Sequence, residues 1–434
     1  MQHNKNKFLI IFAAALALVA MVVSAQAATW DNTQVYNGTV LSYKLAVGDK
    51  LKSASDDTVR IFTAQYNSPW NLLLFTDRST SAPMNWSTDI VGTDSVSIRD
   101  AVAIGDVNGD GINDLVYGRY SSPYRVKRIY WTGSAWATQE LATFTSTIYG
   151  ITVGDADNDG VNEIYVAAGS NVQMIKWNGS AWVITQIYTG SSSMYGGVAI
   201  GDFDAAYSGN ELALSDYYAH VVEVRWTGSA WTSNILYSNG SMGFYSTAVG
   251  DFDASNPGAE IALWNGYGTY GAYELYGSGA SWSIRTLYTS TTWSGPGQIA
   301  VGEFYTGNPG AEVLAVSGGG SAYEARAIYG SGATWTTEKI MGTGGAAYGC
   351  AIGNLNRYRT GNEVAISGNT GKVWEAEEKV VSKDMAAYTI DNLPFLIKAN
   401  DVVTVKATIK NYAQFSQAPG VPVKLSITGP GGYV

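Results

Sequence analysis

Residues 151–168, ITVGDADNDGVNEIYVAA, hold a short apolar run, a Gly-Asp pair, an acidic loop and a second apolar run. The apolar runs are rich in β-branched residues and the loop in Asn, Asp and Gly, so the stretch predicts two strands joined by a tight turn. The first run recurs seven times, as LAVGD, AVAIGD, ITVGD, VAIGD, TAVGD, IAVGE and CAIGN. Its glycines are Gly48, Gly105, Gly154, Gly201, Gly250, Gly302 and Gly353.

A second repeated element is an outer strand that starts near a tryptophan and usually follows a Gly/Ser turn. Six copies come 18 to 20 residues before a Gly-Asp pair, at Trp86, Trp136, Trp182, Trp231, Trp282 and Trp335. Trp30, 18 residues before Gly48, is the seventh. A unit of about fifty residues with short strands is typical of a four-stranded propeller blade. The sequence therefore predicts an all-β, seven-bladed propeller over residues 28–380, closed by the N-terminal strand around Trp30.

The two ends of the chain differ from the repeats. Lys5 and Lys7 precede an apolar run and an Ala-Gln-Ala site, so residues 1–27 are expected to be a signal peptide of a secreted or cell-surface protein. An uncleaved membrane anchor is the alternative, and no later segment is apolar enough to span a bilayer. Residues 381–434 alternate in period two and predict the start of an Ig-like sandwich, either truncated or completed by another chain.

Charge and cysteine content narrow the possible functions. The formal net charge of −10 argues against nucleic-acid binding, which needs clustered Lys and Arg, and suits cations. Cys350 is the single cysteine, so an intrachain disulfide is excluded, and stability has to come from packing and from metal.

Two loops carry oxygen donors at positions one, three, five, seven and nine after the strand. Hard oxygen donors at this spacing suit Ca²⁺, and a glycine allows the sharp turn. Without the cation the carboxylates would repel one another. The predicted Ca²⁺ ligands are Asp106, Asn108, Asp110, the Ile112 carbonyl and Asp114 in one loop, and Asp155, Asp157, Asp159, the Val161 carbonyl and Glu163 in the next.

The remaining loops keep less of this pattern. Two of them lack the acid at position five but keep three acids each, which we include as weaker Ca²⁺ candidates: Asp202, Asp204 and Glu211, and Asp251, Asp253 and Glu260. The last two loops retain little beyond Glu312 and Glu363, and an ordinary turn is the better interpretation there. In the first blade, Asp49 and Asp57 hold the end positions with lysines between them.

These repeats resemble FG-GAP repeats, also called VCBS-type repeats, of integrin-α-like propellers over roughly residues 29 to 380. The resemblance implies a seven-bladed propeller with Ca²⁺ on its lower face and a role in adhesion or ligand binding. The metal roles carry over to the loops that start at Asp106 and Asp155. The tail is similar to adhesive modules of archaeal or bacterial surface proteins.

On the opposite face, tyrosines recur where the chain enters the Gly-Asp strand: Tyr43, Tyr149, Tyr195, Tyr245 and Tyr348. Loops between second and third strands add further aromatic residues, such as Tyr120, Tyr217 and Tyr267. An aromatic face of low charge can stack on sugar rings or bury protein partners, although packing between blades would also use such rings. Four sequons offer glycosylation sites at Asn37, Asn85, Asn178 and Asn239.

Three functions remain open. The first is a calcium-binding adhesion or binding module for glycans or cell-surface proteins. The second is an extracellular polysaccharide lyase or glycosidase, for which Asp100 beside Arg99 is the first catalytic candidate. The third is a structural subunit of a surface layer or filament that assembles through its C-terminal domain. The sequence has no nucleophile elbow or zinc cluster, so an enzyme is the less favoured interpretation.

Overall fold

The computed structural model describes residues 29–38, 42–79, 84–218, 220–295, 297–305, 308, 310–356, 361–379, 385–391 and 406–411. Within these ranges the chain forms strands and turns and no helix, so no helix there is long and apolar enough to cross a membrane. The chain divides into two units, Ala28–Lys379 and the remaining residues at both ends.

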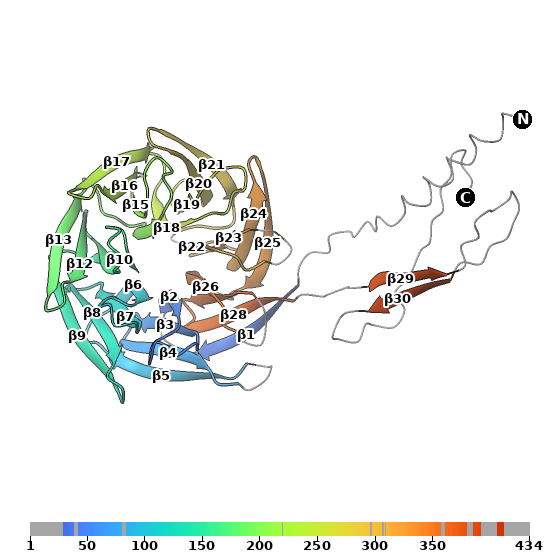
Figure 1. The fold of residues 1–434 in the computed structure, drawn as a ribbon, viewed down its shortest axis with the longest axis horizontal. Helices are drawn as coiled ribbons and strands as arrows, with labels where there is room; N and C mark the ends of the chain where they lie inside the picture. The colour runs from blue at the N-terminus through green and yellow to red at the C-terminus, as the bar shows by residue number, and fades with distance from the viewer. Residues whose placement is uncertain are drawn as a thin grey trace, which may run out of the picture. The chain divides into compact units, whose positions relative to one another are not determined.

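The first unit contains seven four-stranded antiparallel sheets arranged as blades around a ring (Figure 1). Blades 1 to 4 comprise β2(Ser42–Gly48), β3(Arg60–Gln65), β4(Asn71–Asp77) and β5(Trp86–Thr93); β6(Ile98–Gly105), β7(Asp114–Arg119), β8(Arg125–Trp131) and β9(Trp136–Thr143); β10(Ile148–Gly154), β11(Glu163–Ala168), β12(Asn171–Trp177) and β13(Trp182–Thr189); and β14(Val198–Gly201), β15(Glu211–Ser215), β16(His220–Trp226) and β17(Trp231–Ser238). Blades 5 to 7 comprise β18(Phe244–Gly250), β19(Glu260–Asn265), β20(Gly271–Ser278) and β21(Ser281–Thr289); β22(Gln298–Gly302), β23(Glu312–Val316), β24(Glu324–Ser331) and β25(Thr334–Gly342); and β26(Ala347–Gly353), β27(Glu363–Gly368), β28(Lys372–Lys379) and β1(Thr29–Asn37).

The N-terminal strand closes the ring, as the sequence predicts. The last sheet has the order β1-β28-β27-β26, and β1 pairs antiparallel with β28 from Thr29↔Lys379 to Asn37↔Lys372. Trp30 of β1 packs against Phe304 and Tyr305 of the preceding blade, with ring centroids 6.1 and 6.4 Å apart. Blade 7 is therefore built from both ends of the propeller, which leaves no open sheet array at the junction.

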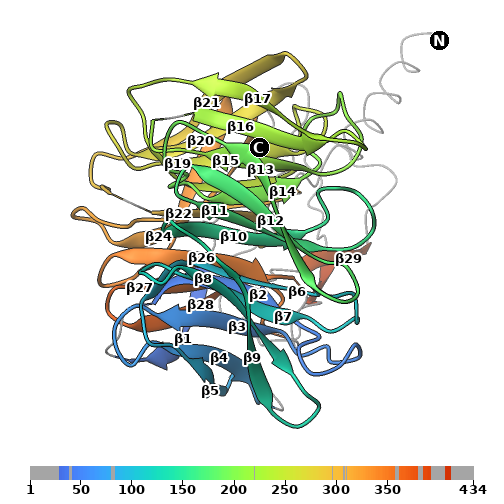
Figure 2. The same cartoon turned by 90° about the vertical axis from the view of Figure 1, so that its left-hand side faces the viewer.

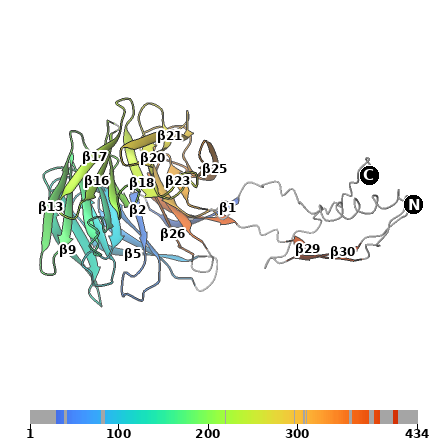
Figure 3. The ribbon, with the colours of Figure 1, turned by 45° about the horizontal axis from the view of Figure 1, so that its top comes forward.

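The strand that ends in Gly-Asp lies innermost, and the tryptophan strand lies at the rim. Figure 1 shows β2, β6, β10, β18, β22 and β26 nearest the centre, and Figure 3 shows β9, β13, β17 and β21 along the outside. Figure 2 presents the ring from the side on which β9 and β13 face the viewer. The second strand of every blade is wholly buried, because neighbouring blades cover both of its faces.

The repeated glycine is required by the packing around the axis. A Cβ added to Gly154 would lie 2.7 Å from Ile200 of the next blade, and one added to Gly250 would lie 2.5 Å from Val301. The same meeting of a glycine with the Val or Ile that precedes the next glycine occurs in all seven blades and closes with Gly353 against Val47. The Val/Ile-Gly pair is thus a contact between blades, and it explains why the motif persists where the acidic loop has degenerated.

The second unit has one described pair of strands, β29(Met385–Asp391) and β30(Lys406–Asn411), which are antiparallel. The rest of the predicted sandwich and the predicted signal peptide lie outside the described residues.

Candidate functional site

The loop at residues 106–114 folds around the carboxylate of Asp106. Its Oδ1 accepts hydrogen bonds from the backbone N–H groups of Gly109 (2.8 Å) and Asp110 (3.2 Å), and its Oδ2 accepts one from Gly111 (2.7 Å). Asn108 donates to Asp110 Oδ2 at 2.9 Å. Buried Asp114 pairs with Arg128 at 2.9 Å, and burial, partly offset by Arg128, raises the pKa of Asp114 to about 6.

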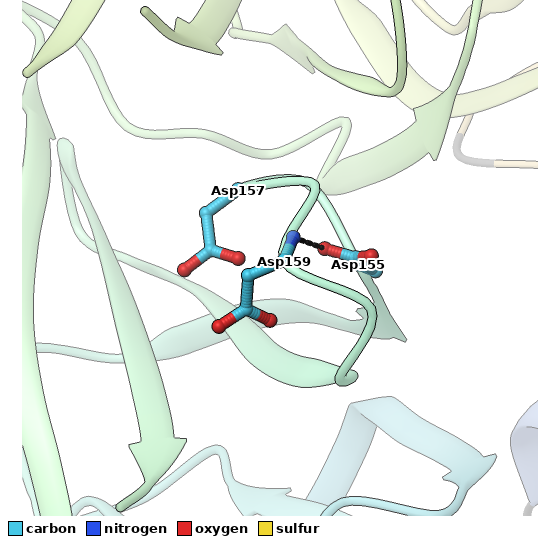
Figure 4. Close-up of side chains that lie close together, drawn as sticks. All are labelled: Asp155, Asp157 and Asp159. Carbon is cyan, nitrogen blue, oxygen red and sulfur yellow. Dashed lines mark hydrogen bonds between the residues drawn. The ribbon is translucent and has the colours of Figure 1, made fainter. Parts of the chain in front are cut away.

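The loop at residues 155–163 gathers three carboxylates, shown in Figure 4. Asp155 Oδ1 accepts a hydrogen bond from the backbone N–H of Asp159 at 3.0 Å, and ligand oxygens of Asp155, Asp157 and Asp159 all lie within 4.8 Å of one another. Oxygens on opposite sides of a Ca²⁺ ion are about 5 Å apart, given the usual Ca–O distance. The spacing of the carboxylates therefore fits this cation.

A lysine ammonium lies in the same loop. Lys176 Nζ is 2.6 Å from Asp157 Oδ2, 2.6 Å from Asp159 Oδ2 and 3.0 Å from Glu163 Oε1. Burial disfavours its charge, but the hydrogen bonds to the three carboxylates outweigh burial and raise the pKa of Lys176. Asp157 Oδ1 is buried and has no hydrogen-bond partner. The carboxylates of this loop therefore bind a positive charge, the Lys176 ammonium, and Asp157 Oδ1 is left as a buried acceptor without a hydrogen bond.

In four other blades the acid at the start of the second strand is used by its own loop. Oε2 of Glu211 accepts the backbone N–H groups of Phe203 (3.2 Å) and Asp204 (3.3 Å). The equivalent glutamates make the same pair of bonds: Glu260 with residues 252 and 253, Glu312 with 304 and 305, and Glu363 with 355 and 356. In the loop at 155–163, Tyr165 O–H instead bridges Ala156 N–H and Glu163, which turns Glu163 Oε1 toward Lys176.

Asp204 and Asp253, predicted as weaker Ca²⁺ ligands, are fully buried and bind the hairpin of the next blade. Asp204 Oδ1 accepts from Ser278 Oγ (2.9 Å) and from the backbone N–H of Gly279 (2.8 Å). Asp253 Oδ1 makes the matching bonds with Ser331 (3.0 Å) and Gly332 (2.9 Å). These two carboxylates already serve as contacts between blades, while Asp202 and Asp251 at the loop start are exposed.

We expect Asp253→Ala to lower the free energy of unfolding by about 3 kcal/mol, because it leaves the N–H of Gly332 and part of the Arg285 charge without a partner. Arg285 lies 2.9 Å from Asp253 Oδ2 and also pairs with Glu274. Denaturant unfolding measures the change, and Asp251→Ala is the matched control. Equal midpoints for the two variants would contradict the proposed contact.

The first blade differs from the sequence interpretation. The residue opposite Gly48 in the register is Arg60, where the other blades have an acid, and Asp57 lies outside this position. Arg60 NH1 is 2.7 Å from Asp56 Oδ2, so a guanidinium already supplies the positive charge inside this loop.

On the opposite face, three of the tyrosines predicted from the sequence lie at bulges of the innermost strands, and Tyr195 lies in the segment before β14. In three blades the tyrosine is the unpaired residue of the register, since pairing skips Tyr149, Tyr245 and Tyr348. A bulge re-aims a side chain away from the regular ladder. The repeated bulge is a feature that the sequence analysis missed.

Every blade contributes to one small cavity where the chain enters the innermost strands, which we call the axial mouth. Its lining residues include, in blade order, Lys44, Arg99 and Asp100, Tyr149, Tyr195, Tyr245, Gln298 and Tyr348. The cavity is partly open to solvent and has a volume of about 40 Å³, enough for a few water molecules and too small for a sugar ring. A larger ligand can only lie over the mouth. The side chain of Tyr43, the fifth predicted tyrosine, lies outside the described residues.

The tyrosines of the mouth form a continuous aromatic group. The rings of Tyr149 and Tyr195 have centroids 4.4 Å apart, and Tyr195 is 6.0 Å from Tyr245. Tyr120 and Tyr217, from loops between second and third strands, pack against this row at 6.4 and 5.5 Å. Burial, with the neighbouring phenol, raises the pKa of Tyr149 and of Tyr245 to about 12, so the hydroxyls stay protonated and can donate hydrogen bonds.

Charged residues also line the mouth. Arg99 Nε is 2.7 Å from Asp100 Oδ2, and these side chains are 22% and 20% exposed. Because they face a narrow cavity rather than bulk water, burial raises the pKa of Asp100, although Arg99 and Lys44 oppose the shift. Asp100 is the one carboxylate among the described residues of the lining, so the described residues do not form the two-carboxylate arrangement of glycoside hydrolysis there.

The predicted glycosylation sites and the single cysteine lie at separate places in the fold. Asn37, Asn85 and Asn178 are exposed, whereas Asn239 is half-buried and its Nδ2 donates to Tyr237 O–H at 2.9 Å. Cys350 is buried, and burial raises the pKa of its thiol to about 12, which makes it unreactive.

A family model for the FG-GAP-like repeat matches residues 106–166, the segment with both complete acidic loops. No curated protein matches the chain significantly. Among solved structures, the chain is similar to the BP39L lectin from Burkholderia pseudomallei, with a TM-score of 0.57 and 14% identity over 77% of this chain and 96% of that chain. The SapL1 lectin, solved in complex with alpha methyl fucoside, has a TM-score of 0.44 and 14% identity, and the match covers 69% of this chain and 97% of that chain. At 14% identity the likeness to BP39L is one of fold.

Proposed function

The chain is a seven-bladed β-propeller of FG-GAP repeats, and from that premise we propose that it is a glycan-binding module whose ligand lies on the tyrosine face. The observation that carries the proposal is the convergence of all seven blades on the axial mouth, with Tyr149, Tyr195 and Tyr245 side by side. Aromatic faces flanked by hydroxyl donors suit the apolar faces and hydroxyl rims of sugar rings. That BP39L, which is similar in fold, is a lectin supports this assignment.

We expect the triple change Tyr149→Ala, Tyr195→Ala and Tyr245→Ala to abolish detectable binding on a glycan array, because it removes the aromatic surface. Loss of three stacking residues at about 1 kcal/mol or more each weakens binding at least a hundredfold. The control is Tyr207→Ala, which removes a 41% exposed tyrosine from an acidic-loop segment instead. Binding that survives the triple change while the protein stays folded would assign the ligand to another surface.

We further propose that Ca²⁺ occupies the loops at 106–114 and 155–163 as a structural ion. The matching donor pattern of the two loops supports this, as do the spacing of Asp155, Asp157 and Asp159 and the buried Asp157 Oδ1 in the second loop. Asp155, Asp157, Asp159 and Glu163 would hold the ion in the second loop, and the ion would neutralise charges that Lys176 now balances. Secretion, expected from residues 1–27, is part of the same proposal.

A further inference from the structure

Resting on the glycan-binding function proposed above, we infer that the axial mouth selects saccharides that carry a carboxylate, such as uronates or sialic-type sugars. The first observation is the place of the charges. Arg99 brings a permanent cation into the mouth and Lys44 a second basic side chain, whose pKa burial lowers, against the single carboxylate of Asp100 among the described lining residues. The chain as a whole carries a net charge of −10, so this positive site stands out against an acidic background.

The second observation is how the backbone presents Arg99. The register of β6 jumps from Ile98↔Arg119 to Val102↔Tyr117, so three residues of β6 lie opposite a single residue of β7. Three other blades place a tyrosine at a one-residue bulge, but this blade places Arg99 and Asp100 at a longer one. Bulges re-aim side chains at functional sites, and here the re-aimed group is a guanidinium.

The third observation is the support around the guanidinium. Arg99 Cζ lies 4.7 Å from the ring centroid of Tyr120, and NH1 donates to the Tyr120 hydroxyl at 3.1 Å. Nε faces Asp100, which fixes the orientation of the planar group. An Arg held in this way loses little conformational entropy when it binds a planar anion, and guanidinium matches carboxylate geometry with two parallel N–H donors.

The chemistry of the surrounding wall favours a carboxylated sugar over a simple anion. Tyr149 and Tyr195 offer a ring face beside the cation, and the cavity volume of about 40 Å³ suits a small group such as a carboxylate. The pyranose ring would then lie on the tyrosines while its carboxylate points toward Arg99. Charge pairs in a narrow, poorly solvated site are stronger than on an open surface.

The test compares matched ligands by calorimetry. Oligogalacturonate is paired with its carboxyl-reduced form and sialyllactose with lactose, at one fixed free Ca²⁺ concentration because carboxylated sugars bind the ion themselves. We expect the acidic member of at least one pair to bind about tenfold more tightly, with an affinity that falls as salt rises. The two pairs distinguish uronate from sialic-type ligands.

Variants that remove either the positive or the negative charge of the mouth test which residue sets the preference. Arg99→Gln should bring the affinities of the two members of a pair together, Arg99→Lys should retain part of the preference, and Asp100→Asn should strengthen acidic binding about threefold. Arg125→Gln is the control, since that half-exposed cation pairs with Glu140 on the outermost strand. Melting curves establish that each variant is folded.

Equal binding within both pairs, or a preference that survives Arg99→Gln in a folded protein, would overturn the inference and leave glycan binding intact. If neither member of either pair binds while neutral glycans on the array do, the inference alone fails. If no saccharide binds at all, the proposed function fails together with it.

Discussion

A protein that lacks residues 28–37 is expected to lose its cooperative fold. The deletion removes β1, the outermost strand of blade 7, and leaves β28 with an unpaired edge along eight register positions. It also removes buried Val35 and the packing of Trp30 and Tyr36 against Phe304 and Phe75. Burial of each of these three side chains contributes about 1.5–3 kcal/mol. Their combined contribution is comparable to the whole free energy of unfolding of a typical domain.

Size-exclusion chromatography and thermal melting measure this loss, and a circular permutant supplies the control. Because Thr29 lies opposite Lys379, moving residues 29–38 to follow Lys379 through a two-residue turn rebuilds the same antiparallel pair as a hairpin. The permutant should melt close to the parent, whereas the deletion should aggregate through its exposed edge. A monomeric deletion protein with unchanged melting would show that ring closure contributes little.

The repeat made the fold predictable because each blade is held by local pairing and by contacts with its neighbours only. The Gly at each strand end and the Trp at each rim strand are both set by packing, so they persist in all seven copies. The seventh Trp at the N-terminus then required the closure that β1 and β28 confirm. The predicted sandwich has no repeat to support it, and most of it lies outside the described residues.

The site was less predictable because one residue type serves different roles. A glutamate at the end of the loop suggests a metal ligand from the sequence, yet Glu211 and Glu260 accept hydrogen bonds from backbone N–H groups of their own loops. One feature of the sequence does indicate a structural role for this glutamate: it is retained in blades where the acid at position five is lost. The roles of Lys176 and Arg60 depend on cross-strand register, so spacing along the chain does not reveal them.

The tyrosines also show that spacing along the chain does not reveal what depends on strand register. Their recurrence five residues before the glycine, or six for Tyr195, predicted a shared face, and Tyr149, Tyr195, Tyr245 and Tyr348 do line one cavity. The bulge at Tyr149, Tyr245 and Tyr348 depends on one extra residue in the strand pairing, which the sequence of a single blade does not show. The sequence singles out Asp100 beside Arg99 as a catalytic candidate, whereas the longer bulge that presents these residues is visible in the register alone.

Removal of Ca²⁺ by a chelator is expected to lower the melting temperature by about 5–10 °C. An ion held a thousandfold above its dissociation constant stabilises the fold by about 4 kcal/mol, and two loops are proposed to bind one each. Asp155→Ala with Asp159→Ala should remove about half of the response, because Asp157 and Glu163 alone offer too few oxygens for the ion. Asp202→Ala with Asp251→Ala is the matched control and should keep the full response.

A substitution of Lys176 tests the same calcium site, and it is expected to increase the response to chelation where the aspartate substitutions reduce it. Without calcium its ammonium is the group that balances Asp157, Asp159 and Glu163, so Lys176→Met should melt lower than the parent in chelator. With Ca²⁺ present the ion replaces that charge, and the variant should recover most of the difference, so its response to chelation exceeds that of the parent. Calorimetric titration with CaCl₂ measures the binding directly. If the parent melts alike with and without chelator and takes up no calcium, then Lys176 is the permanent counter-ion of this loop, and the propeller is held by packing and by contacts between blades such as those of Asp204 and Asp253.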